Sequence, residues 1–210
     1  MLGLEGRTGP RTRRPPEQAQ EEILDAAERH LVADGPYAVR VQVIAREIGI
    51  TDAAVHYHFG SREGLLQALL RRAGRRLRDE VVEVIERWDP ESLDIGELGE
   101  LLRRLYSERG YARLTAWLRL AGWSPSGAGM LRPQAEELHR LRADAGADDQ
   151  AQPDLDDTLF SLVLLNMVLW SEPLIGEAAL KMFGLVGDEL TARRFRRWLT
   201  QLVGEHLSVP

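Results

Sequence analysis

The sequence has no cysteine, a single lysine (Lys181) and no long unbroken apolar run. Without cysteine, the chain can have no disulfide, no thiolate nucleophile and no cysteine-ligated metal. Its longest apolar stretch, residues 159–170, is interrupted by Ser161 and Asn166 and falls short of the roughly 20 residues that a membrane helix needs. The first residues lack the apolar core of about 7–15 residues that a signal peptide carries. We therefore expect a cytoplasmic protein without a membrane partner.

Sequence patterns of common enzymes and metal sites are also missing. The stretch Ser124-Pro125-Ser126-Gly127 does not form the G-x-S-x-G nucleophile elbow, and the sequence has no phosphate-binding loop. His56 and His58 are two residues apart, so on a helix they project about 200° from each other and cannot share one ion. The Asp-rich residues 144–157 do not fit the spacing of a calcium loop. We expect no enzyme activity, no cofactor and no metal.

The composition is that of an ordinary globular protein whose charge is unevenly divided. Of 210 residues, 44% are hydrophobic and 29% are charged, and the net charge is −6. Residues 1–78 contain 13 arginines and 10 acidic residues, a net charge of +3, so the remaining residues carry −9. Because phosphate affinity depends on the local face of a protein, an acidic total does not exclude nucleic acid. The more basic N-terminal part is the candidate for such contacts.

Residues 41–66 have the pattern of two short helices and the start of a third. Gly49 suits the left-handed end of the first helix, and Thr51 is a good N-cap for a second helix at residues 52–59. The apolar residues of the first helix recur at i, i+3, i+4 and i+7; they are Val41, Ile44, Ala45 and Ile48. Two short helices joined by a tight turn predict a helix-turn-helix, whose second helix enters the DNA major groove.

This region resembles the DNA-binding end of the tetracycline-repressor (TetR) family of bacterial transcriptional regulators. The matching runs are Ile44 to Thr51 and Tyr57 to Leu66, and the preceding Glu22 to Ala27 resembles the family's first helix. The match covers about residues 17–70. The resemblance implies an all-α fold of about nine helices. Residues 17–60 would form a three-helix helix-turn-helix domain, and residues 61–210 a larger helical effector-binding and dimerisation domain.

The expected DNA contacts lie on the two short helices and at the start of the next. Small Ala53 and Ala54 permit close approach to base edges, whereas Asp52 suits either a cytosine amino group or its own helix N-terminus. The resemblance places Gln42 where some relatives reach bases, although simple exposure is the competing interpretation. It also matches Tyr57, His58 and Arg62 to phosphate-contacting positions. The full candidate set is Arg40, Gln42, Thr51, Asp52, Ala53, Ala54, His56, Tyr57, His58 and Arg62.

Residues 1–16 form an arginine-containing arm with almost nothing to bury, and we expect it to be flexible without a partner. Two interpretations remain open for it. The arm lies along DNA phosphates or in the minor groove, or it is an inert tail. A second arginine cluster, at residues 71–78, begins nine residues past Arg62, roughly 13 Å along a helix axis. We expect this cluster to be solvated or to pair between domains.

Helical periodicity continues to the C-terminus without the alternation of strands. Residues 17–33, 52–59, 91–108, 110–123, 131–145, 155–171 and 188–207 are the expected helices, together with one from about 40 to Gly49, one from 62 to about 88, and a short helix or loop at 173–183. The resemblance implies that the middle helices enclose an effector, since a mostly apolar cavity with few polar groups is the usual small-molecule site. The candidates are Trp88, Tyr106, Tyr111, Trp117, Trp123, Met130, His139, Asn166 and Met167, each of which also suits an ordinary core.

The last two long helices are the expected dimer interface. Residues 155–171 are apolar nearly all round, so the helix they form must be covered on every side. In the TetR family these two helices pair with the partner subunit's copies, although burial within one chain is the alternative. The candidates are Phe160, Leu164, Met167, Val168, Phe195, Trp198, Leu199 and Leu202. A two-fold dimer would read a palindromic operator.

The function that follows is sequence-specific DNA binding, as a homodimeric repressor that a small-molecule effector releases from its operator. Release requires that the effector bind more tightly to a conformation whose reading helices miss the half-sites. An activator, a co-repressed regulator and a DNA-binding dimer without a ligand fit the sequence equally. Residues 62–88 connect the reading helix to the body and are the expected transmitter.

Overall fold

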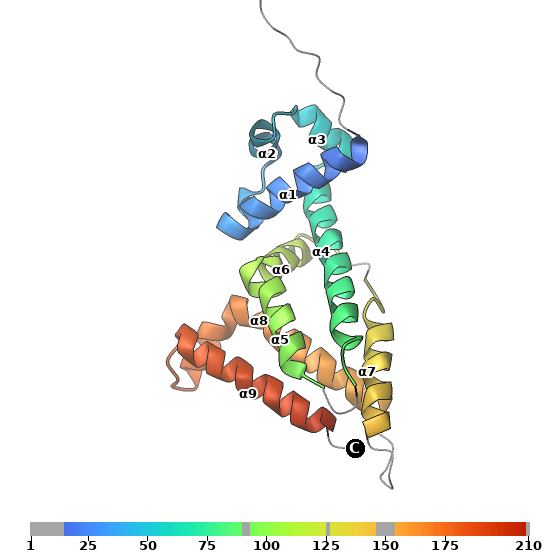
Figure 1. Ribbon diagram of the computed structural model, residues 1–210. Helices are drawn as coiled ribbons and strands as arrows, with labels where there is room; N and C mark the ends of the chain where they lie inside the picture. The colour runs from blue at the N-terminus through green and yellow to red at the C-terminus, as the bar shows by residue number, and fades with distance from the viewer. Residues whose placement is uncertain (1–14, 90–92, 125–126, 146–153, 209–210) are drawn as a thin grey trace, which may run out of the picture.

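The computed structural model describes residues 15–89, 93–124, 127–145 and 154–208, and within these ranges all regular structure is helical. The nine α-helices of the described residues are α1 Pro16–Asp34, α2 Val41–Glu47, α3 Asp52–Phe59, α4 Arg62–Ile85, α5 Ile95–Arg103, α6 Tyr111–Leu120, α7 Arg132–Ala145, α8 Leu155–Met182 and α9 Glu189–Ser208 (Figure 1). A 3-10 turn, η1 Pro36–Ala38, follows α1, and a π-helical turn, η2 Arg104–Glu108, extends α5. The predicted all-α fold is confirmed.

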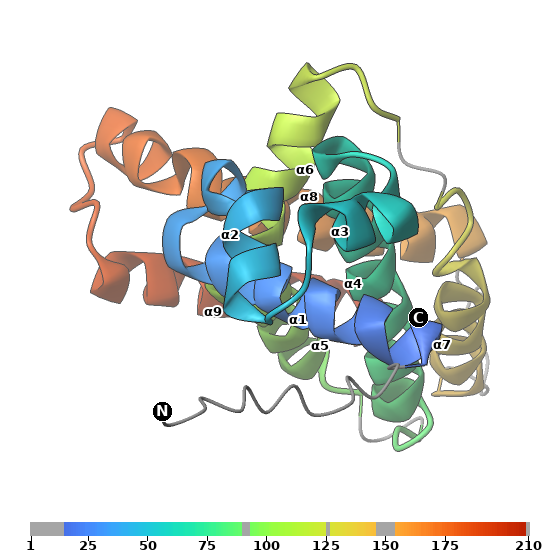
Figure 2. The ribbon, with the colours of Figure 1, turned by 90° about the horizontal axis from the view of Figure 1, so that it is seen from above.

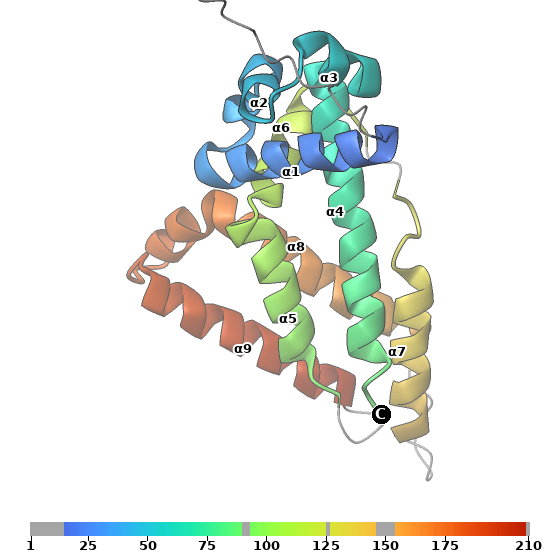
Figure 3. The ribbon, with the colours of Figure 1, turned by 45° about the horizontal axis from the view of Figure 1, so that its top comes forward.

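Helices α1, α2 and α3 pack together at one end of the molecule, and α4 runs from them into the larger half (Figure 1). The sequence explains the packing, because each helix places one apolar stripe inward. Ile23 and Leu31 of α1, Ile44 of α2 and Leu65 of α4 are 0% exposed, and Val55 of α3 is 1% exposed. α1 crosses the first half of α4 (Figure 3). The short helix α3 is therefore held in place by its contacts with α2 and α4.

Both ends of α3 and the start of α4 are where the sequence predicts them, whereas α2 ends at Glu47 and α4 at Ile85, each two or three residues earlier than predicted. The hydroxyl of Thr51 accepts from the Ala54 amide at 3.2 Å, and that of Ser61 accepts from the Gly64 amide at 3.0 Å. Gly49 adopts φ 70°, a left-handed conformation that glycine reaches without a Cβ clash. Arg40 makes no side-chain cap for α2, as its chemistry requires. These turns set the angle between α2 and α3.

Helix α8 differs from the prediction, because it continues through Pro173 to Met182 instead of ending at Ser171. A proline inside a helix removes one backbone hydrogen bond and adds a local clash. Here α8 packs against α9, and Glu172, the residue before Pro173, forms an ion pair with Arg196 of α9. Tertiary packing thus outweighs the local preference to end.

Helix α5 also begins later than the predicted residue 91, at Ile95, because Asp94 accepts a hydrogen bond from the Gly96 amide at 2.9 Å and caps it. Residues 90–92 lie outside the described part of the chain.

The arginine cluster of α4 ties the two halves of the molecule together. Arg72 is only 3% exposed. Its guanidinium bonds three carboxylates of α1, at 3.1 Å to Glu21, 2.6 Å to Asp25 and 2.7 Å to Glu28. Glu28 also accepts from Arg76 at 3.2 Å. The predicted pairing between domains is confirmed for this part of the cluster.

Candidate nucleic-acid interface and cavities

Helix α3 presents one solvent-facing side at the end of the molecule, next to α2 (Figure 2). Thr51, Asp52, Ala53 and His56 are exposed, and Tyr57 is 83% exposed. Ala54 is half-buried, and the next residue, Val55, is buried in the core. An exposed tyrosine above a rigid apolar base is a side chain available for a partner. Thr51, Asp52, Ala53, His56 and Tyr57 are thus all open to solvent, and their contact with DNA stays a prediction.

Helix α2 lies beside α3 with Arg40 and Gln42 exposed. It is clamped to α1 by Glu47, which accepts from Arg29 at 2.5 Å and contacts His30 at 2.7 Å. Hydrogen bonds from Arg29 and then His30 hold the pKa of Glu47 below its usual range, so the carboxylate stays charged at neutral pH. The clamp fixes α2, and α2 in turn positions α3.

The two histidines of α3 have local contacts. His56 Nδ1 lies 3.0 Å from the Gly60 carbonyl oxygen, where it supports the C-terminal turn of the helix. His58 is half-buried, and its ring meets Tyr57 edge-on at 5.2 Å. Both residues remain candidates for DNA contacts. No group of three or more metal-ligating side chains occurs in the part of the chain that the structure describes.

Arg62 does not lie as the sequence predicts. The resemblance implies a phosphate contact, but the side chain turns inward in the structure. Its Nε donates to the Val39 carbonyl at 2.7 Å and a terminal nitrogen donates to the Pro36 carbonyl at 2.5 Å. The guanidinium also lies over the Trp117 ring, 4.9 Å from the centroid. The carbonyl oxygens of the first residue of η1 and of the residue that follows η1 supply the fixed acceptors that a planar guanidinium fork fits. Arg62 therefore joins the reading domain to α6.

Helix α6 makes two further contacts with the N-terminal domain. The Tyr111 hydroxyl donates to Glu28 of α1 at 2.9 Å, and the Tyr37 and Trp117 rings meet edge-on at 6.2 Å. Burial raises the pKa of Tyr111, so its hydroxyl remains a neutral donor. Tyr111 and Trp117, predicted to line an effector cavity, belong instead to this inter-domain contact. The aromatic composition of α6 does not distinguish a cavity wall from a packed helix interface.

A cavity of about 490 Å³ lies among α4, α5, α7 and α8 and has a mainly apolar wall. Of the predicted effector residues, Met130 and Asn166 line it. Tyr106 stands behind Asn166, to which its hydroxyl donates at 2.7 Å. Burial raises the pKa of Tyr106 to about 12. Other lining residues are Val81, Leu98, Leu102, Gln134, Leu138, Leu159, Phe160 and Val163.

Besides Tyr106, Tyr111 and Trp117, four more predicted effector residues do not line this cavity. Trp88 is buried and donates from its ring nitrogen to Glu97 at 3.3 Å, whereas Met167 is 62% exposed on α8. His139 contacts the Thr158 hydroxyl at 3.1 Å, and Trp123 packs partly buried against the core. Gln134 lines the cavity but was not among the predicted effector residues. Its Oε1 is buried and has no hydrogen-bond partner in the described part of the chain. Its position on the inner side of α7 was the available signal.

The predicted dimer residues form a largely exposed apolar surface on α8 and α9. Phe160 is 68%, Met167 62% and Trp198 56% exposed, and Leu164 and Leu202 are also exposed. Val168 and Phe195 are half-buried. The prediction that Leu199 lies in the dimer interface is wrong, since Leu199 is 3% exposed and belongs to the chain's own core. We name the exposed set Phe160, Leu164, Met167, Trp198 and Leu202 the α8–α9 apolar surface.

Helix α8 has a second property that bears on this surface. In the described part of the chain it is the one helix long and apolar enough to cross a membrane, with a mean hydropathy of 1.6 over its best 18 residues. The prediction of no such helix rested on the interrupted run at 159–170 and did not include the extension through Pro173. One side of α8 packs on this chain's own α5, α7 and α9, with Leu165 and Leu169 buried. Its apolar character is thus partly that of a core helix.

Comparison with known proteins points to one family. Residues 23–69 match the family model of bacterial regulatory proteins, tetR family. The chain is 39% identical over 64 residues to the HTH-type transcriptional regulator BetI of Rhizobium meliloti, covering 30% of this chain and 32% of BetI. It is 32% identical over 102 residues to an uncharacterised HTH-type transcriptional regulator of Mycobacterium tuberculosis, covering 48% and 49% of the two chains. The chain thus matches a third to a half of the length of these relatives.

Solved structures extend the likeness over most of the chain. A Saccharomonospora viridis protein crystallised with choline aligns with a TM-score of 0.62 at 19% identity, covering 92% of this chain and 97% of that one. The multidrug binding protein EbrR in complex with imidazole aligns with a TM-score of 0.55 at 20% identity, covering 91% and 96%. At these identities the likeness shows the fold alone, over about nine tenths of the chain.

Proposed function

We propose that this chain, whose residues 23–69 match the family model of bacterial regulatory proteins, tetR family, is a homodimeric transcriptional repressor that a small-molecule effector releases from a palindromic operator. Such a protein acts where the chromosome is, in the bacterial cytoplasm. The observation that carries the proposal is the exposed face of α3, with Tyr57 83% exposed above the fully buried base formed by Ile44 and Leu65. A rigid short helix of this kind fits the major groove.

The dimer rests on the α8–α9 apolar surface. Large apolar side chains that gather on one exposed face usually mark an interface, because water solvates them poorly. A second copy is the proposed occupant, since a self-complementary pair of helices needs only a two-fold axis. Dimerisation would also place two α3 helices for two half-sites, which one eight-residue helix cannot read alone with useful affinity. A membrane is the competing occupant, and sedimentation of the protein with lipid vesicles in the absence of DNA would indicate it.

The cavity among α4, α5, α7 and α8 is the proposed effector site. Its volume of about 490 Å³ suits a small organic molecule. Arg132 is the one charged residue among those lining it, and Arg132 pairs with Glu136 at 2.7 Å. Choline, bound by the structural relative from Saccharomonospora viridis, is a cation, and this cavity has no carboxylate in its described lining with which to balance one. We therefore propose a neutral, mostly apolar effector.

Two polar side chains of the cavity indicate which hydrogen-bonding groups such an effector would carry. Gln134 Oε1 is a buried acceptor without a partner, and a hydrogen-bond donor on the effector would satisfy it. Asn166 uses its Oδ1 to accept from Tyr106, which leaves its amide nitrogen as a donor. An apolar molecule with one donor and one acceptor group, such as an alcohol or an amide, matches both. These two residues then fix its orientation.

The proposed transmitter is α6 together with α4. From α8, the Trp170 ring nitrogen donates to the Thr115 hydroxyl of α6 at 2.7 Å. From α6, Tyr111 and Trp117 contact the reading domain through Glu28 and Arg62. A ligand that shifts α8 or η2 moves α6, and α6 has direct contacts with both α1 and the start of α4. The sequence pointed to α4 alone, because side-chain contacts across the domains are not visible in it.

Titration of purified protein on a labelled duplex, with and without the neutral fraction of a cell extract, tests this function. A releasing effector should weaken DNA binding by about 10²-fold, a coupling of about 2.7 kcal/mol. Gln134→Leu should reduce the response and leave DNA affinity without effector unchanged. Tighter binding with the extract would instead indicate a co-repressed regulator. DNA binding that no fraction alters would contradict the effector switch.

A further inference from the structure

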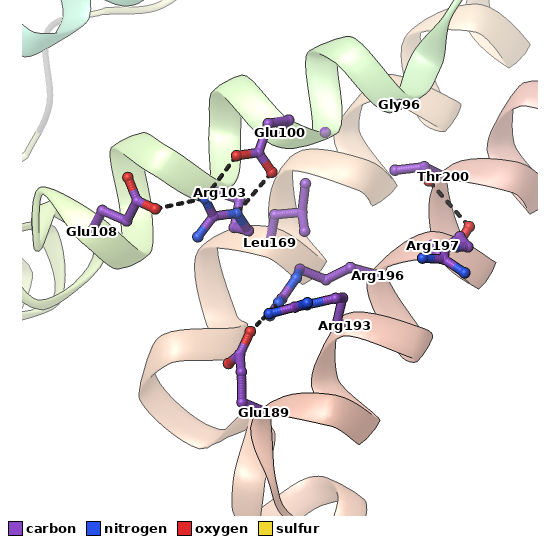
Figure 4. Close-up of a pocket in the computed structure, with 11 residues that line it drawn as sticks. Gly96, Glu100, Arg103, Glu108, Leu169, Glu189, Arg193, Arg196, Arg197 and Thr200 are labelled. Carbon is purple, nitrogen blue, oxygen red and sulfur yellow. Dashed lines mark hydrogen bonds and ion pairs between the residues drawn. The ribbon is translucent and has the colours of Figure 1, made fainter.

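A second cavity, of about 600 Å³, lies between α5 and α9 with Leu169 of α8 at its base, separate from the proposed effector site (Figure 4). Its wall is polar, with Arg103 on α5 and Arg193, Arg196 and Arg197 on α9. Figure 4 shows Arg103 and two glutamates on one side, with Arg193 and Arg196 opposite them. The concentration of four guanidinium groups in one cavity requires an explanation, because like charges repel.

The carboxylates of the cavity are already used by two of the arginines. Arg103 bonds both oxygens of Glu100, at 2.8 and 2.7 Å, and Glu108 at 2.6 Å. Arg196 pairs with Glu172 and bonds Glu189 at 2.6 Å. These pairs are partly protected from water, since the side chain of Arg196 is 14% exposed and that of Glu172 is 13% exposed. They form a frame around the cavity. Two arginines and four glutamates give this frame a formal charge of −2, but the side chains of Glu100, Glu108 and Glu189 are more than half exposed to water, which screens their charge.

Arg193 and Arg197 remain outside this frame. Neither guanidinium forms an ion pair or a hydrogen bond with any residue that the structure describes. They are one helical turn apart, at i and i+4, where like charges destabilise a helix. Two free guanidinium forks on the same stripe of a helix, both lining one cavity, are suited to bind the oxygens of a carboxylate or a phosphate.

The shape of the cavity depends on a glycine of α5. A Cβ on Gly99 would come within 2.5 Å of the Thr200 Cγ2 atom, so a larger residue would force α5 and α9 apart. Gly96 also lines the cavity. The close approach keeps Arg103 and the α9 arginines around the same space. DNA is not the partner of this cavity, because α9 and α3 lie at opposite ends of the molecule (Figure 1).

We infer that the cavity between α5 and α9 is a binding site for a small dianion, a dicarboxylate or a phosphate ester, held by Arg193 and Arg197. One dianion neutralises both free guanidinium groups and removes their mutual repulsion. It also bridges to the frame on α5, so binding would hold α5 and α9 together. This site is independent of the effector cavity and of the proposed DNA-binding function.

Isothermal titration calorimetry without DNA tests the inference, with inorganic phosphate and succinate as probes at constant ionic strength set by sodium chloride. We expect saturable binding of at least one probe, with one site per chain. The double variant Arg193→Ala/Arg197→Ala should bind at least tenfold more weakly. Arg194→Ala is the matched control, an exposed arginine of the same helix that does not line the cavity, and should bind within twofold of the wild type.

The two probes also separate the sources of the dianion. Binding of phosphate alone indicates a phosphate ester, and binding of succinate alone indicates a dicarboxylate. Arg193→Gln, which preserves side-chain bulk, should also weaken binding and serves if the double variant folds poorly. The inference is overturned if neither probe binds the wild type, or if the double variant binds as tightly as Arg194→Ala. Either result leaves DNA binding untouched, because no duplex is present.

Discussion

The Arg62 guanidinium lies 4.9 Å from the centre of the Trp117 ring while it donates to two carbonyl oxygens of the segment 36–39. One residue at the start of α4 thus holds η1 on one side and α6 on the other. The contact is part cation–π and part hydrogen bond, and it sits directly between the reading domain and the larger helical domain.

Replacing the Trp117 ring should weaken the effect of the effector on DNA binding more than it lowers the stability of the fold. Trp117→Leu keeps an apolar side chain but removes the cation–π contact and the edge-on contact with Tyr37. We expect a loss of about 1–2 kcal/mol in the free energy of unfolding. The effector-induced change in DNA affinity should fall by at least threefold. Urea denaturation and DNA titration with and without effector measure the two effects. An unchanged effector response would remove α6 from the transmission route.

The exposed Tyr57 of α3 should contribute to operator affinity and not to the stability of the fold. Tyr57→Ala removes a side chain that is 83% exposed, so we expect the free energy of unfolding to change by less than about 0.5 kcal/mol. Affinity for the operator should fall at least tenfold. Arg71→Ala is the control, since this exposed arginine of α4 lies away from α3. Equal losses in the two variants would mean that general charge, not the α3 face, governs binding.

The buried arginine of α4 should be important for stability. Arg72→Met leaves the half-buried Glu28 with only the partly exposed Arg76 as a guanidinium partner, and we expect a loss of about 2 kcal/mol in the free energy of unfolding. The value is below that for a fully buried pair because Glu21 and Asp25, with side chains 57% and 54% exposed, can be solvated. Arg71→Met should change stability by less than about 0.5 kcal/mol. Similar values for both variants would show that the ion pairs contribute little.

The clamp between α1 and α2 should depend on pH. Glu47 has its pKa lowered from the ordinary value of 4.5 by Arg29 and then His30. A carboxylate with a lowered pKa stabilises the fold fully above the unfolded value, and this stabilisation is lost as pH falls through the folded pKa. We therefore expect Glu47→Gln to flatten the decline of stability below pH 4.5, and thermal unfolding between pH 3 and 7 measures it. An acid decline as steep as in the wild type would exclude this clamp as its source.

The α8–α9 apolar surface should control the oligomeric state. Leu164→Glu places a charge on that surface and should convert the dimer to a folded monomer with weaker operator binding. Leu120→Glu is matched, because Leu120 is an exposed leucine at the end of α6, outside the surface. Light scattering reports the mass of each variant. A wild-type monomer, or a dimer that survives Leu164→Glu, would contradict the proposed interface.

The sequence predicts the N-terminal domain closely and the larger domain only in outline. Caps and turns at Thr51, Ser61 and Gly49 act locally, so the bounds of α3 match the prediction residue for residue. Pro173 is different, because the packing of α8 on α9 decides its effect. Arg62 and Tyr111 face partners 26 and 83 residues away, and spacing along the chain contains no signal of such contacts. For the same reason the sequence did not indicate that Gln134 lines the effector cavity, and it wrongly placed Trp117 there.

The central claim is that two α3 helices, related by a two-fold axis, read one duplex. Selection of bound DNA from a random pool tests this claim most directly, because it reports binding, symmetry and half-site spacing together. We expect enrichment of an inverted repeat, bound by one dimer, that Tyr57→Ala fails to enrich. A pool without any enriched sequence, or with a single unrepeated half-site, would contradict it.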